Sequence, residues 1–224
     1  MALPIAVLVS GSGSNLQALI DRVESGALEA RIALVLSNKP DAYGLERAKK
    51  HGIPALCIPH KDYADRVDFD RAMIRAIREA GAEAVVLAGF MRMLSSEFLQ
   101  AFAGRVLNIH PALLPSFPGV HGQRDAADYG VTLAGCTVHF VDELMDHGEV
   151  VIQAAVPAYP YDDGQTLGER ILAMEHRILP QAVQWLATGR IQVIGRKVHV
   201  MSTGMPAALP PADALVNPPL EHGF

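Results

Sequence analysis

Short apolar runs alternate with segments whose apolar residues recur every three to four positions, throughout the first half of the chain. The runs have the length of buried strands, and the periodic segments between them are typical of amphipathic helices. The five expected strands cover 5–9, 32–36, 55–58, 84–88 and 106–109. Because nearly continuous apolar strands are typical of sheets covered on both faces, the pattern predicts an α/β fold with a doubly wound, mostly parallel open sheet and helices on both faces.

The pattern changes after residue 110. Two more strands are expected over 136–141 and 150–156, followed by a helix over 166–187 and a strand pair within 191–200. Segment 111–123 is rich in proline and glycine, which predicts a long surface loop. From Met205 onward the chain carries five prolines in twenty residues. We therefore expect a single domain over 1–204 and an irregular tail over 205–224.

Composition narrows the classes of protein. The 224 residues carry a net charge of −5 and half of them are hydrophobic, which predicts a globular protein and argues against a nucleic-acid partner. The two cysteines, Cys57 and Cys136, lie far apart and form no CxxC motif, so no disulfide framework is expected. The first apolar run lacks a preceding basic segment and is too short to span a bilayer. These features predict a cytoplasmic protein with no membrane attachment.

A turn rich in serine and glycine, 10–15, separates the first expected strand from the first expected helix. Glycine lets backbone amides approach a ligand closely, and a helix N-terminus favours an anion. The dinucleotide fingerprint fails here because Leu16 stands where the third glycine belongs, and no Gly-Lys-Ser/Thr is present. The turn therefore favours a phosphate ligand, with a capped turn that binds nothing as the alternative.

Asn108 and His110 lie two residues apart at the end of the fifth expected strand. Side chains at this spacing point to the same side of a strand, and ligands of doubly wound sheets bind beyond the carboxyl ends of the strands. Asn108 offers a neutral hydrogen-bond donor, whereas His110 titrates near neutrality. The pair suits a reaction in which a carbonyl oxygen gains negative charge and a proton moves. A structural role in the turn is the alternative.

An acidic stretch, 142–149, carries four carboxylates between two expected strands. A carboxylate from this loop could orient His110 or relay its proton, although a solvated acidic turn is the simpler reading of the sequence alone. No zinc-type spacing occurs in the chain, so no metal is expected. His121, Thr137 and His139 are candidate supporting groups, with a buried structural role as the default for His139.

Three of these segments together resemble phosphoribosylglycinamide formyltransferase, the folate-dependent enzyme of purine synthesis. They are Ser10–Gln17, Leu87–Arg92 and Leu107–Pro111, and the resemblance covers about residues 3–190. Methionyl-tRNA formyltransferase and formyltetrahydrofolate hydrolase share the Asn-x-His-Pro core. The tRNA enzyme adds a C-terminal domain and the hydrolase an N-terminal domain, and we expect neither in this chain.

The resemblance implies a role for each matching residue. Asn108, His110 and Asp146 match the catalytic trio of the family. The residues that match the ribonucleotide and phosphate site are Gly13, Ser14, Asn15 and Glu175. The residues that match the folate site are Arg66, Met91, Arg92, Met93, Leu94, Asn108, Val141, Asp142, Glu143, Leu144 and Met145. After Asp146 the family commonly shows Gly-Gly-Pro, whereas this chain has His147-Gly148-Glu149.

The implied activity is transfer of the formyl group of 10-formyltetrahydrofolate, as cosubstrate, to the amine of glycinamide ribonucleotide. The resemblance implies a fold of the Rossmann-like formyltransferase type, a monomer or weak homodimer, and only small molecules as partners. Two alternatives stay open from the residues. One is a 10-formyltetrahydrofolate hydrolase, and the other is a non-catalytic module that binds phosphate or nucleotides.

Overall fold

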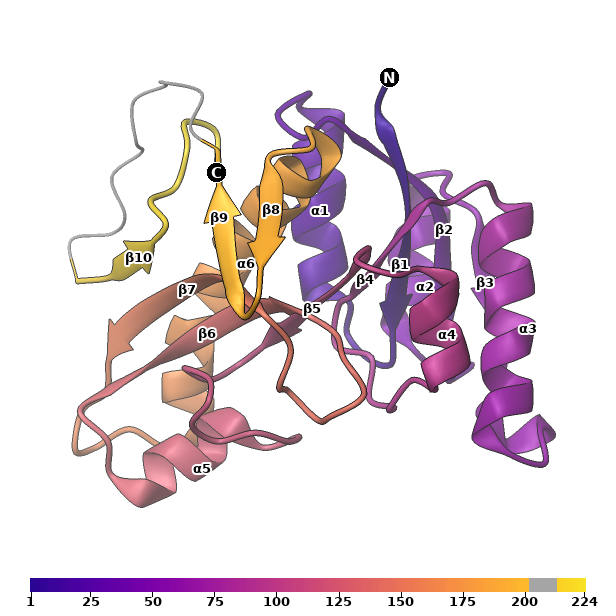
Figure 1. Ribbon diagram of the computed structural model, residues 1–224. Coiled ribbons are helices and arrows are strands. Elements are labelled where there is room, and N and C mark those ends of the chain that lie inside the picture. The colour runs from indigo at the N-terminus through magenta and orange to yellow at the C-terminus, as the bar shows by residue number, and fades with distance from the viewer. Residues whose placement is uncertain (202–212) are drawn as a thin grey trace. The chain divides into compact units, whose positions relative to one another are not determined.

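The computed structural model describes residues 1–201 and 213–224, which divide into two compact units, Met1–Asn108 and Ile109–Phe224 (Figure 1). The part of the predicted tail within 202–212 lies outside the described residues. No helix among the residues described is both long and apolar enough to cross a membrane.

The first unit is a parallel sheet with intervening helices. Its strands lie in the order β3-β2-β1-β4-β5, and every neighbouring pair is parallel. Its elements are β1 (Leu3–Val9), α1 (Ser14–Glu24), β2 (Ala30–Ser37), α2 (Tyr43–Lys50), β3 (Ala55–Cys57), the 3₁₀ turn η1 (His60–Asp62), α3 (Arg66–Glu79), β4 (Ala84–Leu87), α4 (Ser96–Ala101) and β5 (Val106–His110), whose last two residues belong to the second unit. The predicted α/β class with a mostly parallel sheet is confirmed.

Strand β1 is the buried centre of this sheet. All five residues from Ile5 to Val9 have no exposed surface, and β1 is flanked by β2 and β4. A strand enclosed on both faces cannot alternate polar with apolar residues, because each polar side chain would lose its hydration. The continuous apolar run predicted from the sequence is the consequence of this position.

The turn after β1 is fixed by close contact between two glycines. Gly13 precedes α1 with a left-handed backbone, φ +69°, and a Cβ placed there would lie 2.6 Å from the Cα of Gly44. The N–H of Gly44 donates to the carbonyl oxygen of Gly11 over 3.1 Å. Only glycine meets both the conformation and the spacing, so α2 can support the turn directly.

The second unit combines antiparallel strands with one long helix. β7 pairs antiparallel with both β6 and β10, and β8 and β9 form a separate hairpin. Helix α6 packs against β6, β7 and α5. The elements are α5 (Gly122–Tyr129), β6 (Leu133–Phe140), β7 (Val150–Pro157), α6 (Gly164–Ala187), β8 (Ile191–Ile194), β9 (Lys197–Val200) and β10 (Leu215–Asn217).

Two sequence predictions need correction here. The tail is not wholly irregular, because β10 pairs with β7 and the side chain of Val216 is buried. Segment 111–123 is not a surface loop throughout, since Ala112 and Leu114 are buried and α5 begins at Gly122. Proline and glycine predicted the turns correctly, but these residue types do not indicate which side chains of a turn are buried. The single domain over 1–204 stays a prediction.

Candidate active site

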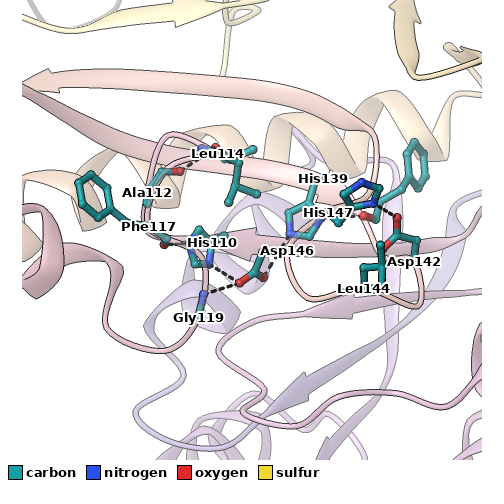
Figure 2. A network of polar contacts seen from close by, with 12 residues as sticks. His110, Ala112, Leu114, Phe117, Gly119, His139, Asp142, Leu144, Asp146 and His147 are labelled. Atoms are coloured by element: carbon teal, nitrogen blue, oxygen red, sulfur yellow. Dashed lines mark hydrogen bonds and ion pairs between the residues drawn. The ribbon is translucent and has the colours of Figure 1, made fainter.

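His110 is the last residue of β5, and it is almost completely enclosed, with 4% of its side chain exposed. Its Nδ1 lies 3.5 Å from Oδ2 of Asp146, and its Nε2 lies 2.8 Å from the carbonyl oxygen of Phe117 (Figure 2). A carbonyl oxygen can only accept, so Nε2 carries a hydrogen and donates it. When His110 is protonated, Nδ1 also carries a hydrogen and forms an ion pair with Asp146.

Asp146 reaches His110 from the loop between β6 and β7. It has a left-handed backbone, φ +50°, which is uncommon for a residue with a Cβ. Its Oδ2 accepts a 2.7 Å hydrogen bond from the N–H of Gly119, and 13% of its side chain is exposed. The carboxylate therefore joins His110 to the segment that follows it. The acidic loop is not merely a solvated turn.

His139 lies on the other side of the carboxylate. Its Nε2 is 3.8 Å from Oδ1 of Asp146, and its Nδ1 donates to the carbonyl oxygen of Phe140 over 2.7 Å (Figure 2). Burial lowers the pKa of His139, and the hydrogen bond to Phe140 and the charge of Asp146 oppose that shift. Burial therefore favours the neutral form of His139.

Thr137 holds the chain just after His110. Its buried hydroxyl donates to the carbonyl oxygen of Ala112 over 2.7 Å and accepts from the N–H of Leu114 over 3.1 Å. Gln153 adds hydrogen bonds of 3.0 Å to the Thr137 hydroxyl and to the Leu114 carbonyl oxygen. Together these bonds satisfy the polar groups of a buried turn. The supporting role of Thr137 at the site stays a prediction.

Asn108 stands two residues before His110 on β5 and is partly exposed. The alternation of a strand directs both side chains to one side. This is the arrangement that the sequence predicted for an amide donor beside a histidine. The catalytic role of either residue stays a prediction.

In the first unit, Ser10 connects two predicted binding segments. Its hydroxyl donates to Oδ1 of Asn38 over 2.6 Å and accepts from the N–H of Met91 over 3.0 Å. The predicted phosphate turn and the predicted folate segment, 91–94, thus begin side by side at the ends of the parallel neighbours β1 and β4. Ser10 was not among the predicted site residues, although its position at a strand end was a signal for it.

The remaining residues of the predicted phosphate turn and folate segment differ in exposure. Gly13 and Asn15 are buried and Ser14 is partly exposed, whereas Met91 is exposed and Leu94 is buried. Their predicted roles in binding stay untested by this geometry.

Arg92 and Arg66 belong to a cluster around the N-terminal half of α3. The Arg92 guanidinium lies 5.4 Å from the centre of the Phe69 ring, and Arg66 is exposed at the first position of the helix. Burial raises the pKa of Asp70, while its hydrogen bonds to Ser95 and the two arginine charges lower it. Asp70 Oδ2 accepts from the N–H of Ser95 over 2.6 Å, which fixes the start of α4 just after the predicted folate segment.

The other predicted residues of the second unit lie in different surroundings. Glu175 is buried on α6, where its charge adds to burial in raising the pKa of Cys136. His121 is exposed just before α5. In the acidic loop, Val141 and Asp142 are partly exposed, and Glu143, Leu144 and Met145 are exposed. Exposed apolar side chains in a loop are available for a ligand, but the predicted folate contacts stay predictions.

Two backbone groups that hold the candidate site could not be predicted from the sequence. The carbonyl of Phe117 and the N–H of Gly119 act through the backbone, so their residue types do not reveal them. Within the part of the chain that the structure describes, no group of three or more His, Cys, Asp or Glu side chains is arranged to hold a metal ion.

An open parallel sheet together with a histidine paired to a loop carboxylate at a strand end corresponds to a known class of protein. A family model described as "Formyl transferase" matches residues 3–183, which include β5 and the loop that carries Asp146.

Similar proteins show which formyl transferases this chain is related to. The Escherichia coli K12 protein named phosphoribosylglycinamide formyltransferase is 43% identical over 189 residues, covering 84% of this chain and 89% of that protein. The crystal structure of glycinamide ribonucleotide transformylase 1 from Symbiobacterium toebii has a TM-score of 0.88 and 46% identity, covering 89% of this chain and 94% of that one. The chain belongs to the phosphoribosylglycinamide formyltransferase family, as the resemblance predicted.

A longer relative is also similar. The trifunctional purine biosynthetic protein adenosine-3 of Drosophila pseudoobscura pseudoobscura is 50% identical over 190 residues. This chain spans 14% of that protein's length. The likeness therefore concerns one part of a larger protein.

Proposed function

We propose that this protein transfers the formyl group of 10-formyltetrahydrofolate to the amine of glycinamide ribonucleotide, a step of purine biosynthesis. The observation that carries the proposal is the pairing of His110 with Asp146 at 3.5 Å, at the end of a strand that also bears Asn108. The family that the chain belongs to supports the same reaction.

In the proposed reaction the neutral amine attacks the formyl carbon directly. The C–N bond forms as the carbonyl π-electrons move to oxygen, and a tetrahedral oxyanion results. Asn108 donates a hydrogen bond to this oxygen, and His110 stabilises or protonates it. Such donors act where charge develops, in a site largely closed to water. Collapse of the intermediate breaks the bond between the formyl carbon and the folate nitrogen and leaves the formyl group on the attacking amine. The folate nitrogen leaves as a neutral amine, because it takes up the proton that the attacking amine gave to Asp146 through water.

Asp146 has two tasks in this scheme. Its carboxylate lies 3.5 Å from Nδ1 of His110 and orients the ring toward the reacting oxygen. It also accepts, through a water, the proton that the attacking amine must lose. No covalent enzyme intermediate is needed, since a neutral amine is already a competent nucleophile.

The substrate sites follow the predicted residues. We assign the ribonucleotide phosphate to Gly13, Ser14 and Asn15, whose backbone opens the N-terminal turn of α1. The folate is assigned to segments 91–94 and 141–145, with Arg66 toward its tail, and Glu175 to the ribonucleotide. A cytoplasmic location, a monomer or weak homodimer and the lack of a metal also stay predictions.

One assay separates the proposed function from its alternatives. Purified protein is given 10-formyltetrahydrofolate with and without glycinamide ribonucleotide, and deformylation of the folate is followed. Turnover that requires the ribonucleotide supports the transferase. Formate release without it identifies a hydrolase, and binding of phosphate ligands with no folate turnover identifies a binding module.

Variants of the three central residues test the assignment. We expect Asn108→Ala and His110→Ala each to lower kcat by about 10²–10³, the usual cost of losing one oxyanion donor. Asp146→Asn should lower kcat more than it weakens folate binding. Near-normal turnover in folded Asn108→Ala and His110→Ala would refute their roles, and a defect of binding alone would move Asp146 to the folate site.

A further inference from the structure

The loop that carries Asp146 is held by the hairpin of β8 and β9. Arg196 occupies the turn of this hairpin, and its Nη2 donates to the carbonyl oxygen of His147 over 2.6 Å. Its Nη1 lies 3.3 and 3.4 Å from the two nitrogens of the His147 ring. One guanidinium thus contacts both the backbone and the ring of the residue that directly follows Asp146.

The His147 ring continues the connection into the loop. Its Nδ1 lies 2.6 Å from Oδ2 of Asp142, and the other oxygen of Asp142 accepts from the N–H of Leu144 over 3.0 Å (Figure 2). A carboxylate only accepts, so Nδ1 carries a hydrogen and donates it. Arg196 contacts the same ring through its Nη1. Arg196, His147 and Asp142 form a chain of contacts across the loop.

The backbone on both sides of His147 is constrained. Asp146 adopts φ +50°, a conformation that costs free energy for a residue with a Cβ. At Gly148, a Cβ would lie 1.8 Å from the carbonyl oxygen of Phe140, so no side chain fits there. A strained residue keeps its conformation only where neighbouring contacts hold it, and the bond from Arg196 is made at the next carbonyl along the chain.

We propose that Arg196 is a positioning residue, which holds the carbonyl of His147 and thereby keeps the Asp146 carboxylate against His110. The inference rests on the proposed function, in which Asp146 takes part in the reaction. Arg196 lies beyond residues 3–183, the part of the chain that the family model matches. The tether also uses His147, at one of the positions where this chain departs from the Gly-Gly-Pro that follows the aspartate in the resemblance.

The test compares two neighbouring cations of one hairpin. Arg196→Ala removes the tether, whereas Lys197→Ala removes an exposed positive charge from the adjacent position. We expect Arg196→Ala to lower kcat roughly three- to tenfold, with the KM of both substrates within about twofold of wild type. Lys197→Ala should match wild type. The amides of the loop 141–149 should exchange hydrogen faster in Arg196→Ala than in Lys197→Ala.

A second pair of variants separates the backbone contact from the ring contact. His147→Ala removes the ring but keeps the carbonyl that Arg196 binds. If the carbonyl is the point of attachment, adding Arg196→Ala to His147→Ala lowers kcat further. An equal kcat for the single His147→Ala and the double variant would overturn the proposal.

Other outcomes also decide the matter. Equal kcat for Arg196→Ala and Lys197→Ala overturns the proposal, and so does an effect confined to the KM of the folate, which would make Arg196 part of that site. A lower melting temperature with unchanged activity per folded molecule overturns it as well. If wild type does not transfer formyl groups at all, the proposed function fails rather than this inference alone.

Discussion

Replacement of Thr137 by valine tests how the chain after His110 is held. Valine has nearly the shape of threonine, so the change removes the hydroxyl and little else. Thr137 has no exposed surface, and its hydroxyl serves the carbonyl of Ala112, the N–H of Leu114 and the amide of Gln153. Water cannot easily take its place in a closed site.

The magnitude follows from the hydrogen bonds that the hydroxyl makes. The Leu114 N–H keeps a 3.2 Å bond to the Ala112 carbonyl oxygen, and Gln153 keeps its 3.0 Å bond to the Leu114 carbonyl oxygen, so no group is left wholly unpaired. Loss of the three bonds of the hydroxyl, at about 0.5–1.5 kcal/mol each, should lower the free energy of unfolding of Thr137→Val by about 1.5–4.5 kcal/mol. Thr137→Ser keeps the hydroxyl and removes one buried methyl, for which about 1 kcal/mol is expected.

The assay is urea unfolding of wild type and both variants, followed by circular dichroism, with kcat measured on the same samples. The free energy of unfolding falls by about 3 kcal/mol for each molar of urea. The urea concentration at the midpoint of unfolding should therefore be lower by about 1 M in Thr137→Val, and by about a third of this in Thr137→Ser. The turn directly follows His110, so kcat should fall in Thr137→Val more than in Thr137→Ser. If the valine variant is as stable as the serine variant, the hydroxyl does not support the turn and the reasoning fails.

Three further changes test other parts of the structure. Gly148→Ala places a Cβ 1.8 Å from the carbonyl oxygen of Phe140, so the loop must move, and steady-state kinetics should show kcat lower by roughly tenfold or more. The pKa of His139 is lowered by burial, so the unfolded chain binds its proton first as the pH falls below about 6.5. The stability of wild type relative to His139→Gln should therefore shrink between pH 7.5 and 5 in urea titrations, and a constant difference would contradict the shift. Arg47→Ala removes a 2.9 Å hydrogen bond to the carbonyl oxygen of Ser12, and should raise the KM of the ribonucleotide about three- to tenfold with little change in kcat. An unchanged KM would show that Arg47 does not support the phosphate turn.

The elements that the sequence predicted well are those whose residues are buried on both faces. The strand expected over 84–88 is observed as Ala84–Leu87, and the run 32–36 lies inside β2. Helix α5 was missed because it has only eight residues and begins at the end of a segment rich in proline and glycine, which predicts a loop. Strand β10 was missed because it has only three residues and two prolines follow it directly, which resembles an irregular tail, although pairing with β7 supplies the order that local sequence does not.

The sequence predicted the part of the candidate site that consists of side chains at strand ends. Asn108 and His110 are two apart on one strand, and their spacing alone places them together. The approach of Asp146 to His110 was one of two readings of the acidic loop and was implied by the resemblance. Residue spacing could not decide between the readings, because the approach depends on a left-handed backbone at Asp146 and on a donor from Gly119. Arg196 gave no signal either, since a lone arginine in a hairpin turn is usually solvated.

The bond between His110 and Phe117 bears on how the proposed reaction distinguishes its transition state from its ground state. In the resting protein the Nε2 hydrogen of His110 is held by a neutral carbonyl at 2.8 Å. To donate to the reacting oxygen, Nε2 must exchange this carbonyl for the substrate. A neutral formyl oxygen offers no advantage over the Phe117 carbonyl, whereas an oxyanion accepts a charge-assisted hydrogen bond that is roughly twice as strong. The exchange is therefore favourable only once charge has developed, and binding energy that appears only then lowers the barrier instead of tightening substrate binding.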